Sequence, residues 1–174
     1  KKLLLVKVVI KRMYMENKKR NILIWTLVLI WMGVIIYFSS IHGEQSVGLS
    51  QYIAGKIYEV MESFSPDTAQ SMGKGRINYL LRKQAHVLVY MLLGIISMHA
   101  LRKNGQRGIK GVIKAFVICV IFATLDEIYQ LYVPGREGRY KDVIIDGIGS
   151  GIGITGYLII EKIKSMRYGS IVSK

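Results

Sequence analysis

The chain has few cysteines, prolines and histidines, and each shortage excludes a class of explanation. Cys119 is the single cysteine, so no intrachain disulfide can form. The two prolines, Pro66 and Pro134, fall between apolar segments and not inside them. Three histidines without an HExxH motif give no recognisable zinc site, and the absence of GxSxG removes the usual mark of a serine nucleophile. We therefore expect no metal and no cofactor of a recognised type.

Acidic residues are also scarce, with 11 Asp and Glu against 25 Lys and Arg, which gives a formal charge of +14. Such a charge favours nucleic-acid binding when it gathers on one face with interleaved aromatic residues. Here the basic residues separate apolar segments, so we do not expect nucleic acid as a partner. A hydrophobic content of 51% in 174 residues indicates a membrane protein of about one domain.

Four apolar runs predict an all-α, polytopic membrane protein. The first run is nearly free of charge and long enough to cross a hydrocarbon core of about 30 Å. The predicted transmembrane helices cover residues 21–41, 84–101, 109–133 and 143–160. They form a domain over residues 21–160, flanked by basic segments at 1–20 and 161–174.

The basic segment before the first run bears on processing and orientation. The chain begins with lysine, and Met13 or Met15 is a candidate natural start. The first run exceeds the apolar region of a signal peptide, which has about 7 to 15 residues, so we expect it to stay uncleaved. Placing both termini inside leaves roughly two thirds of the Lys and Arg residues on the cytoplasmic side. We expect a multi-pass protein of the plasma membrane with both termini in the cytoplasm.

A polar segment at residues 42–83 separates the first two runs. Five apolar residues in it recur at helical spacing: Ile53, Ile57, Val60, Met61 and Phe64. The pattern predicts an amphipathic helix in the first outer loop, lying either at the membrane interface or packed on the end of the bundle. The glycines at residues 73–75 predict a flexible turn before the second span.

Four carboxylates lie at the facing ends of the last two runs: Asp126, Glu127, Asp142 and Asp146. An acidic side chain near the bilayer centre costs about 2.5 to 3.5 kcal/mol, so such residues usually face the bundle interior and have partners. An up-down order of helices brings the end of the first, the start of the second, the end of the third and the start of the fourth to one outer face. We expect the polar residues of these four ends to meet there.

Two stripes support this arrangement. One has a four-residue step and contains Arg82, His86, Tyr90 and Gly94, and the other contains Asp142, Asp146, Gly149 and Gly153. The Gly147 to Gly151 and Gly149 to Gly153 pairs are small-xxx-small contacts. They predict a close helix approach beneath the polar residues.

These motifs, taken in order, resemble the VanZ-like family over residues 38–153. They are Phe38-Ser39-Ser40, Arg82-Lys83-x-Ala85-His86 with Tyr90, Leu93 and Gly94, Asp126-Glu127-x-x-Gln130, Gly135-Arg136, and Asp142 and Asp146 with Gly149. The resemblance implies a small polytopic bacterial membrane protein. The family's namesake is associated with resistance to teicoplanin-type glycopeptide antibiotics, and a member need not share that role.

The first functional hypothesis is a non-enzymatic envelope protein that binds a membrane lipid, a lipid-linked cell-wall precursor or a glycopeptide antibiotic. The candidate ligand-binding residues are Ser39, Ser40, Arg82, Lys83, His86, Tyr90, Gln130 and Arg136. Four cations could hold phosphate or carboxylate groups, because Arg offers a planar fork and Lys a point charge: Arg82, Lys83, Arg136 and Arg139. The alternative is that these cations only neutralise the buried acids.

A second hypothesis is a membrane-embedded hydrolase or transferase acting on a lipid-linked substrate. The catalytic candidates are His86, Asp126, Glu127, Asp142 and Asp146, with His86 as general base or metal ligand or, alternatively, as a structural residue. An all-oxygen Mg²⁺ or Ca²⁺ site stays open. His42 and His99 are expected to be ordinary interface residues. The third hypothesis is a small transporter that uses the acids as a proton relay, which four helices could form only as an oligomer.

Overall fold

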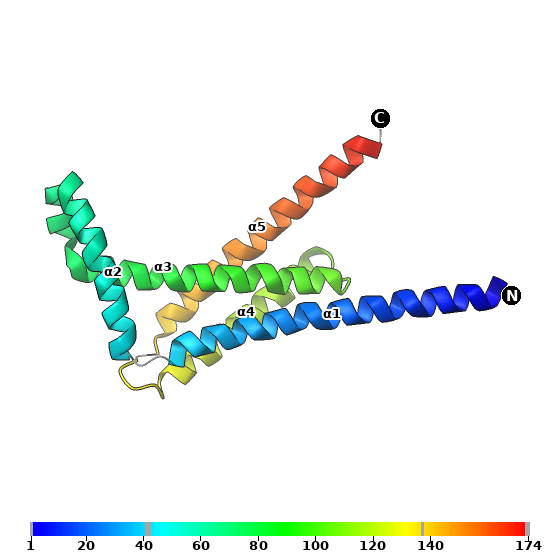
Figure 1. Cartoon of the computed structure of the whole chain (residues 1–174), viewed down its shortest axis with the longest axis horizontal. Helices are drawn as coiled ribbons and strands as arrows, with labels where there is room; N and C mark the ends of the chain where they lie inside the picture. Colours follow the sequence, from blue (N-terminus) through cyan, green and yellow to red (C-terminus); the bar gives the residue numbers. More distant parts are fainter. Residues whose placement is uncertain (1, 41–42, 137, 173–174) are drawn as a thin grey trace.

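The computed structural model describes residues 2–40, 43–136 and 138–172 and consists of five helices joined by short connections (Figure 1). The helices are α1 (Lys2–Ser40), α2 (Gly43–Phe64), α3 (Pro66–Lys103), α4 (Gly108–Gln130) and α5 (Tyr140–Val172). Four of them contain segments long and apolar enough to cross a membrane: Met15–Ser40, Pro66–Lys103, Gly108–Gln130 and Tyr140–Arg167. The predicted all-α architecture with four spans is confirmed.

Helix α3 is the centre of the bundle because it packs against each of the other helices. In Figure 1, α1 and α4 run alongside α3, while α5 crosses it at an angle and α2 lies across its N-terminal end. The core between α1, α3 and α4 contains Val28, Tyr90, Leu93, Cys119 and Ala123, all at most 1% exposed. The N-terminal half of α1 and the C-terminal half of α5 extend beyond this core (Figure 1).

The helices differ in length from the predicted spans. Helix α3 begins at Pro66 and not at about 84, α4 ends at Gln130 and not at 133, and α5 continues through the predicted basic tail to Val172. Hydropathy marks the part of a helix that suits the bilayer, whereas polar residues can continue the helix beyond it. Residue 41, the predicted end of the first span, lies outside the described residues.

The glycine-rich stretch at residues 73–75 forms a kink within α3 and not a separate turn. Gly73 has φ 65° and ψ 156°, which interrupts the helical backbone, and helical structure resumes after it. Glycine adopts this positive φ without the steric cost that a side chain would bring. The kink joins a short N-terminal part of α3 to the long spanning part.

Helix α2 packs against α3 and against no other helix in the described part of the chain. Ala54 is 1% exposed, and Lys74 of α3 lies over the ring of Tyr58 at 5.2 Å. Within the predicted apolar stripe, Val60 and Phe64 are 59% and 87% exposed. The stripe therefore faces away from α3. His42 lies outside the described residues.

The loop between α4 and α5 begins with a tight turn. Gly135 has φ 73°, and the backbone N–H of Arg136 donates to the carbonyl of Val133 at 3.1 Å. Proline followed by a positive-φ glycine at the two central positions is the pattern of a type II turn. The turn directs the chain back towards α3 and α5.

Candidate functional site

Close backbone contact between α3 and α5 positions the site. A Cβ on Gly149 would lie 2.5 Å from the carbonyl oxygen of Val87, and a Cβ on Gly153 would collide with the carbonyl of Met91. A Cβ on Gly94 would in turn collide with the α5 backbone. The predicted contact through Gly149 and Gly153 is confirmed, and small residues here allow two helices to touch along their backbones.

The prediction of a close helix contact through the second pair, Gly147 and Gly151, is wrong. A Cβ on Gly147 or Gly151 would meet the Phe116 side chain only at 3.9 Å, which is an ordinary van der Waals distance. These two glycines face side chains of α4, which hold the backbones apart. Only one of the two overlapping small-xxx-small pairs is therefore needed for packing.

Asp126 is the centre of a buried hydrogen-bond network. Its Oδ2 accepts hydrogen bonds from Ser39 Oγ at 3.0 Å, Tyr90 Oη at 3.3 Å and Gln130 Nε2 at 3.2 Å. The carboxylate is 2% exposed, and its partners come from α1, α3 and α4 itself. The network ties three helices together, which is a structural use of an acid inside a bundle.

The other three acids bind partners on α3 and on the loop. Asp146 Oδ1 lies 3.0 Å from His86 Nδ1, and Asp142 forms an ion pair with Lys83. Glu127 Oε2 accepts a hydrogen bond from the backbone N–H of Arg139 at 2.7 Å. The polar residues of the four predicted helix ends thus meet at one end of the bundle, which we call the cleft end.

The acids at the cleft end lack a full set of partners. In the described part of the chain, Asp126 Oδ1, Glu127 Oε1 and Asp146 Oδ2 are buried without a hydrogen-bond partner. An unsatisfied buried polar group costs about 1 to 3 kcal/mol, and a charged one costs more. These three oxygens therefore need a further partner that the described residues do not provide.

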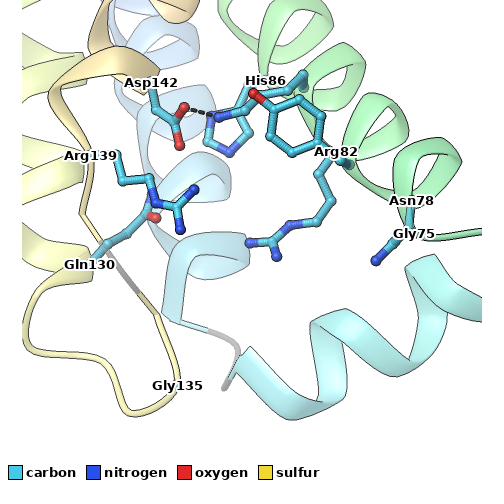
Figure 2. Close-up of a pocket in the computed structure, with 10 residues that line it drawn as sticks. Gly75, Asn78, Arg82, His86, Gln130, Gly135, Arg139 and Asp142 are labelled. Carbon is cyan, nitrogen blue, oxygen red and sulfur yellow. Dashed lines mark hydrogen bonds and ion pairs between the residues drawn. The ribbon is translucent and has the colours of Figure 1, made fainter.

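Above the acids a cleft of about 350 Å³ opens between α3, the loop and the start of α5 (Figure 2). Its lining residues are Gly75, Asn78, Tyr79, Arg82, Lys83, His86, Gln130, Gly135, Arg139 and Asp142. Figure 2 shows the guanidinium groups of Arg82 and Arg139 pointing towards the middle of the cleft. The rim is cationic, and Asp142 is the one acid among the lining residues. His86 connects the cleft to the buried Asp146, so we call the part of the cleft at His86 its floor.

The structure separates the eight predicted ligand-binding residues into two groups. Four of them line the cleft, namely Arg82, Lys83, His86 and Gln130. The other four, Ser39, Ser40, Tyr90 and Arg136, are not among its lining residues. Ser39 and Tyr90 donate to Asp126 instead, so their polar atoms already serve the protein interior.

The remaining two predicted residues, Ser40 and Arg136, connect the end of α1 to α4 and to the loop. Ser40 Oγ bonds the carbonyl of Ile36 at 2.6 Å and the hydroxyl of Tyr129 at 3.0 Å. Arg136 Nη2 donates to the carbonyl of Phe38 at 2.9 Å. Burial, followed by the nearby charge of Arg82, lowers the pKa of Arg136, but its ordinary value is so high that it stays charged. Arg136 fastens the loop to the end of α1.

Sequence reasoning missed three lining residues, Gly75, Asn78 and Tyr79, because the second span was placed too late. A signal for one of them was available. Asn78 precedes Arg82 and His86 by the same four-residue step that defines their stripe. Extending the stripe by one step towards the N-terminus reaches the cleft rim.

One group at the cleft end has the composition of a metal site. His86, Glu127 and Asp146 each offer one ligand atom, and these atoms all lie within 4.8 Å of one another. Asp126 and Asp142, which were also catalytic candidates, do not belong to this group. His86 alone of the three also lines the cleft.

Four apolar helices with buried acids gathered at one end define a polytopic α-helical membrane protein. A family model described as VanZ/LLP1 matches residues 24–161, so the chain belongs to this family. The resemblance to VanZ-like proteins is thereby confirmed. No curated protein and no solved structure matches the chain.

Proposed function

We propose that this VanZ/LLP1-family protein acts in the bacterial cell envelope by binding the anionic headgroup of a lipid-linked precursor at the cleft end. The observation that carries the proposal is the cationic rim of the cleft, where Arg82 and Arg139 point inward and Asn78 and His86 also line the cavity (Figure 2). Guanidinium groups bind phosphate oxygens in pairs, and asparagine adds a neutral donor.

The pairing of charges around the cleft favours a ligand over simple neutralisation. Lys83 is held by Asp142, whereas Arg82 has no carboxylate partner among the described residues. A cation placed only to neutralise an acid would contact one. A phosphate headgroup provides the missing anionic partner.

The proposed orientation places the cleft outside the cytoplasm. Basic residues are concentrated in the N-terminal segment, around the α3–α4 connection and after residue 160, and the positive-inside rule assigns these regions to the cytoplasm. The cleft end would therefore meet lipid headgroups of the outer leaflet.

The direct test is thermal unfolding of the purified full chain in detergent with a prenyl phosphate, compared with a prenyl alcohol of the same chain length. We expect the phosphate alone to raise the melting temperature, by several degrees at saturation. Arg82→Gln should abolish the shift, whereas Arg107→Gln, which lies directly before α4 in the connection from α3, should retain it. Equal shifts with phosphate and alcohol, or no shift in the wild type, would contradict the proposal.

A cellular test addresses teicoplanin-type resistance separately. A sensitive Gram-positive host would express the wild type, His86→Ala, Glu127→Ala or Arg136→Ala at matched membrane levels, with His99→Ala as control. We expect protection by the wild type and by His99→Ala, and loss of protection in the other three. If the wild type does not protect the host, resistance is no longer part of the proposal. Headgroup binding is decided separately, by the thermal-unfolding test with prenyl phosphate.

A hydrolase or transferase is the second candidate function. It is favoured by the contact of His86 Nδ1 with buried Asp146 at 3.0 Å, because a carboxylate can orient an imidazole for acid–base work at the cleft floor. Incubation of a prenyl-linked pyrophosphate with the purified protein would distinguish the two. Headgroup release that His86→Ala abolishes would establish an enzyme, and intact substrate would support binding alone.

A further inference from the structure

Three helices bring one ligand-capable side chain each to a common point below the cleft. His86 comes from α3, Glu127 from α4 and Asp146 from α5, and their candidate ligand atoms lie within 4.8 Å of one another. Glu127 is 5% exposed and Asp146 is fully buried. Two carboxylates in such proximity repel each other when both are ionised.

A second, independent observation indicates a ligand between them. Glu127 and Asp146 each use one carboxylate oxygen within the protein, on the Arg139 backbone N–H and on His86 respectively. The other oxygen of each, Glu127 Oε1 and Asp146 Oδ2, is buried with no hydrogen-bond partner among the described residues. A cation bound by the two carboxylates would supply a partner of the kind they lack and remove the repulsion.

We propose that His86, Glu127 and Asp146 bind one divalent transition-metal ion of the Zn²⁺ or Mn²⁺ class at the cleft floor. One imidazole nitrogen and two carboxylate oxygens suit these ions, whereas Mg²⁺ and Ca²⁺ prefer oxygen donors alone. Bonds of about 2.0 to 2.2 Å place neighbouring ligand atoms roughly 3 to 3.5 Å apart, so the three side chains need only a small inward movement.

Three protein ligands leave at least one coordination position open, which is the arrangement of metal sites that engage a further molecule. His86 also lines the cleft, so the open position is reachable from the rim where Arg82 and Arg139 lie. The site adds to the proposed headgroup function without depending on it. It also departs from the sequence-based expectation of no metal, since ligands on three separate helices leave no local motif.

The test is metal binding by the chelator-stripped full chain in detergent, with Mn²⁺ followed by electron paramagnetic resonance and Zn²⁺ by elemental analysis after dialysis. We expect one ion per chain in the wild type and at least a tenfold weaker affinity in Glu127→Gln and His86→Gln. Asp126→Asn is the matched control, because it removes a neighbouring buried charge on α4 but no ligand. It should still bind one ion per chain.

Each outcome decides the proposal. Absence of stoichiometric Mn²⁺ or Zn²⁺ in a folded wild type overturns it, as does wild-type affinity in both ligand variants. If Glu127→Gln fails to fold, His86→Gln becomes the deciding variant, because the His86 side chain is 20% exposed and Glu127 is 5% exposed. If the chain binds metal but prenyl phosphate does not raise its melting temperature, the cation site stands and the headgroup function is removed. If prenyl phosphate raises the melting temperature but no metal binds, the headgroup function stands and the cation site is removed.

Discussion

Helices α3 and α5 carry polar residues at both ends, and the two ends use them differently. At the cleft end, Asp146 is fully buried and leaves one oxygen without a partner. At the other end, which we call the turn end and which lies near the α3–α4 connection, His99 Nδ1 contacts the Tyr157 hydroxyl at 3.2 Å. There Arg102 also pairs with Glu161 at 3.0 Å, with Glu161 44% exposed.

The two ends differ in whether their carboxylate groups have a full set of partners. All buried carboxylate oxygens without a partner in the described chain belong to the cleft end. The turn end satisfies its charges with an accessible ion pair and a backbone carbonyl, that of Gln106 at 3.1 Å from Arg102. An unsatisfied buried group calls for an explanation, such as a catalytic role or a bound ion or water molecule. We therefore propose the cleft end as the functional end.

The largest expected effect concerns the glycine contact below the cleft end. Gly153→Ala should lower the free energy of unfolding by about 1 to 3 kcal/mol or more, because its Cβ would collide with the α3 backbone. Gly156→Ala, one turn nearer the turn end, meets nothing within 4 Å and should be neutral or stabilising by up to about 1 kcal/mol. Denaturation of both variants in the same detergent measures the difference, and equal losses would count against tight packing at Gly153.

The next effect compares one acid from each end. Asp126→Ala should cost about 1 to 3 kcal/mol, because it leaves the buried donors of Ser39, Tyr90 and Gln130 without their acceptor. Glu161→Ala should cost at most about 1 kcal/mol, since its ion pair is partly exposed. Thermal unfolding provides both values. A larger loss of stability in Glu161→Ala than in Asp126→Ala would contradict the description of Asp126 as a buried network residue and of Glu161 as a partly exposed one.

The smallest effect compares two arginines. Arg82→Gln should change stability by less than about 0.5 kcal/mol, because no ion pair among the described residues depends on it. Arg102→Gln should cost about 0.5 to 1.5 kcal/mol through its lost bonds to Glu161 and Gln106. A rim residue that binds a ligand contributes to function and little to folding. A stability loss in Arg82→Gln as large as in Arg102→Gln would make it a structural residue.

Much of this architecture could be predicted from the sequence because long apolar runs have few alternatives to a spanning helix. The positions of Asp126 and Asp146 at facing helix ends also predicted that they would meet. The helix bounds were harder to predict, since α3 extends through a polar region to Pro66 and α5 through a basic one to Val172. Composition indicates which part of a helix is apolar but not where the helix begins and ends.

The details of the site depended on atomic positions. Ser39 and Tyr90 lie at the predicted end, yet they face Asp126 and not the cleft. A small rotation of a helix decides between those two directions, and residue spacing does not determine it. The same holds for Glu127, whose partner is a loop N–H that no side-chain pattern identifies.

Hydrogen–deuterium exchange of the full chain, with and without prenyl phosphate, tests the difference between the two ends most directly. We predict slower exchange at residues 75–83, 133–136 and 138–139, which contain the cleft-lining residues of α3 and the loop, and unchanged exchange at residues 104–108 of the turn end. Equal protection at both ends, or protection at the turn end alone, would contradict the assignment of ligand binding to the cleft end.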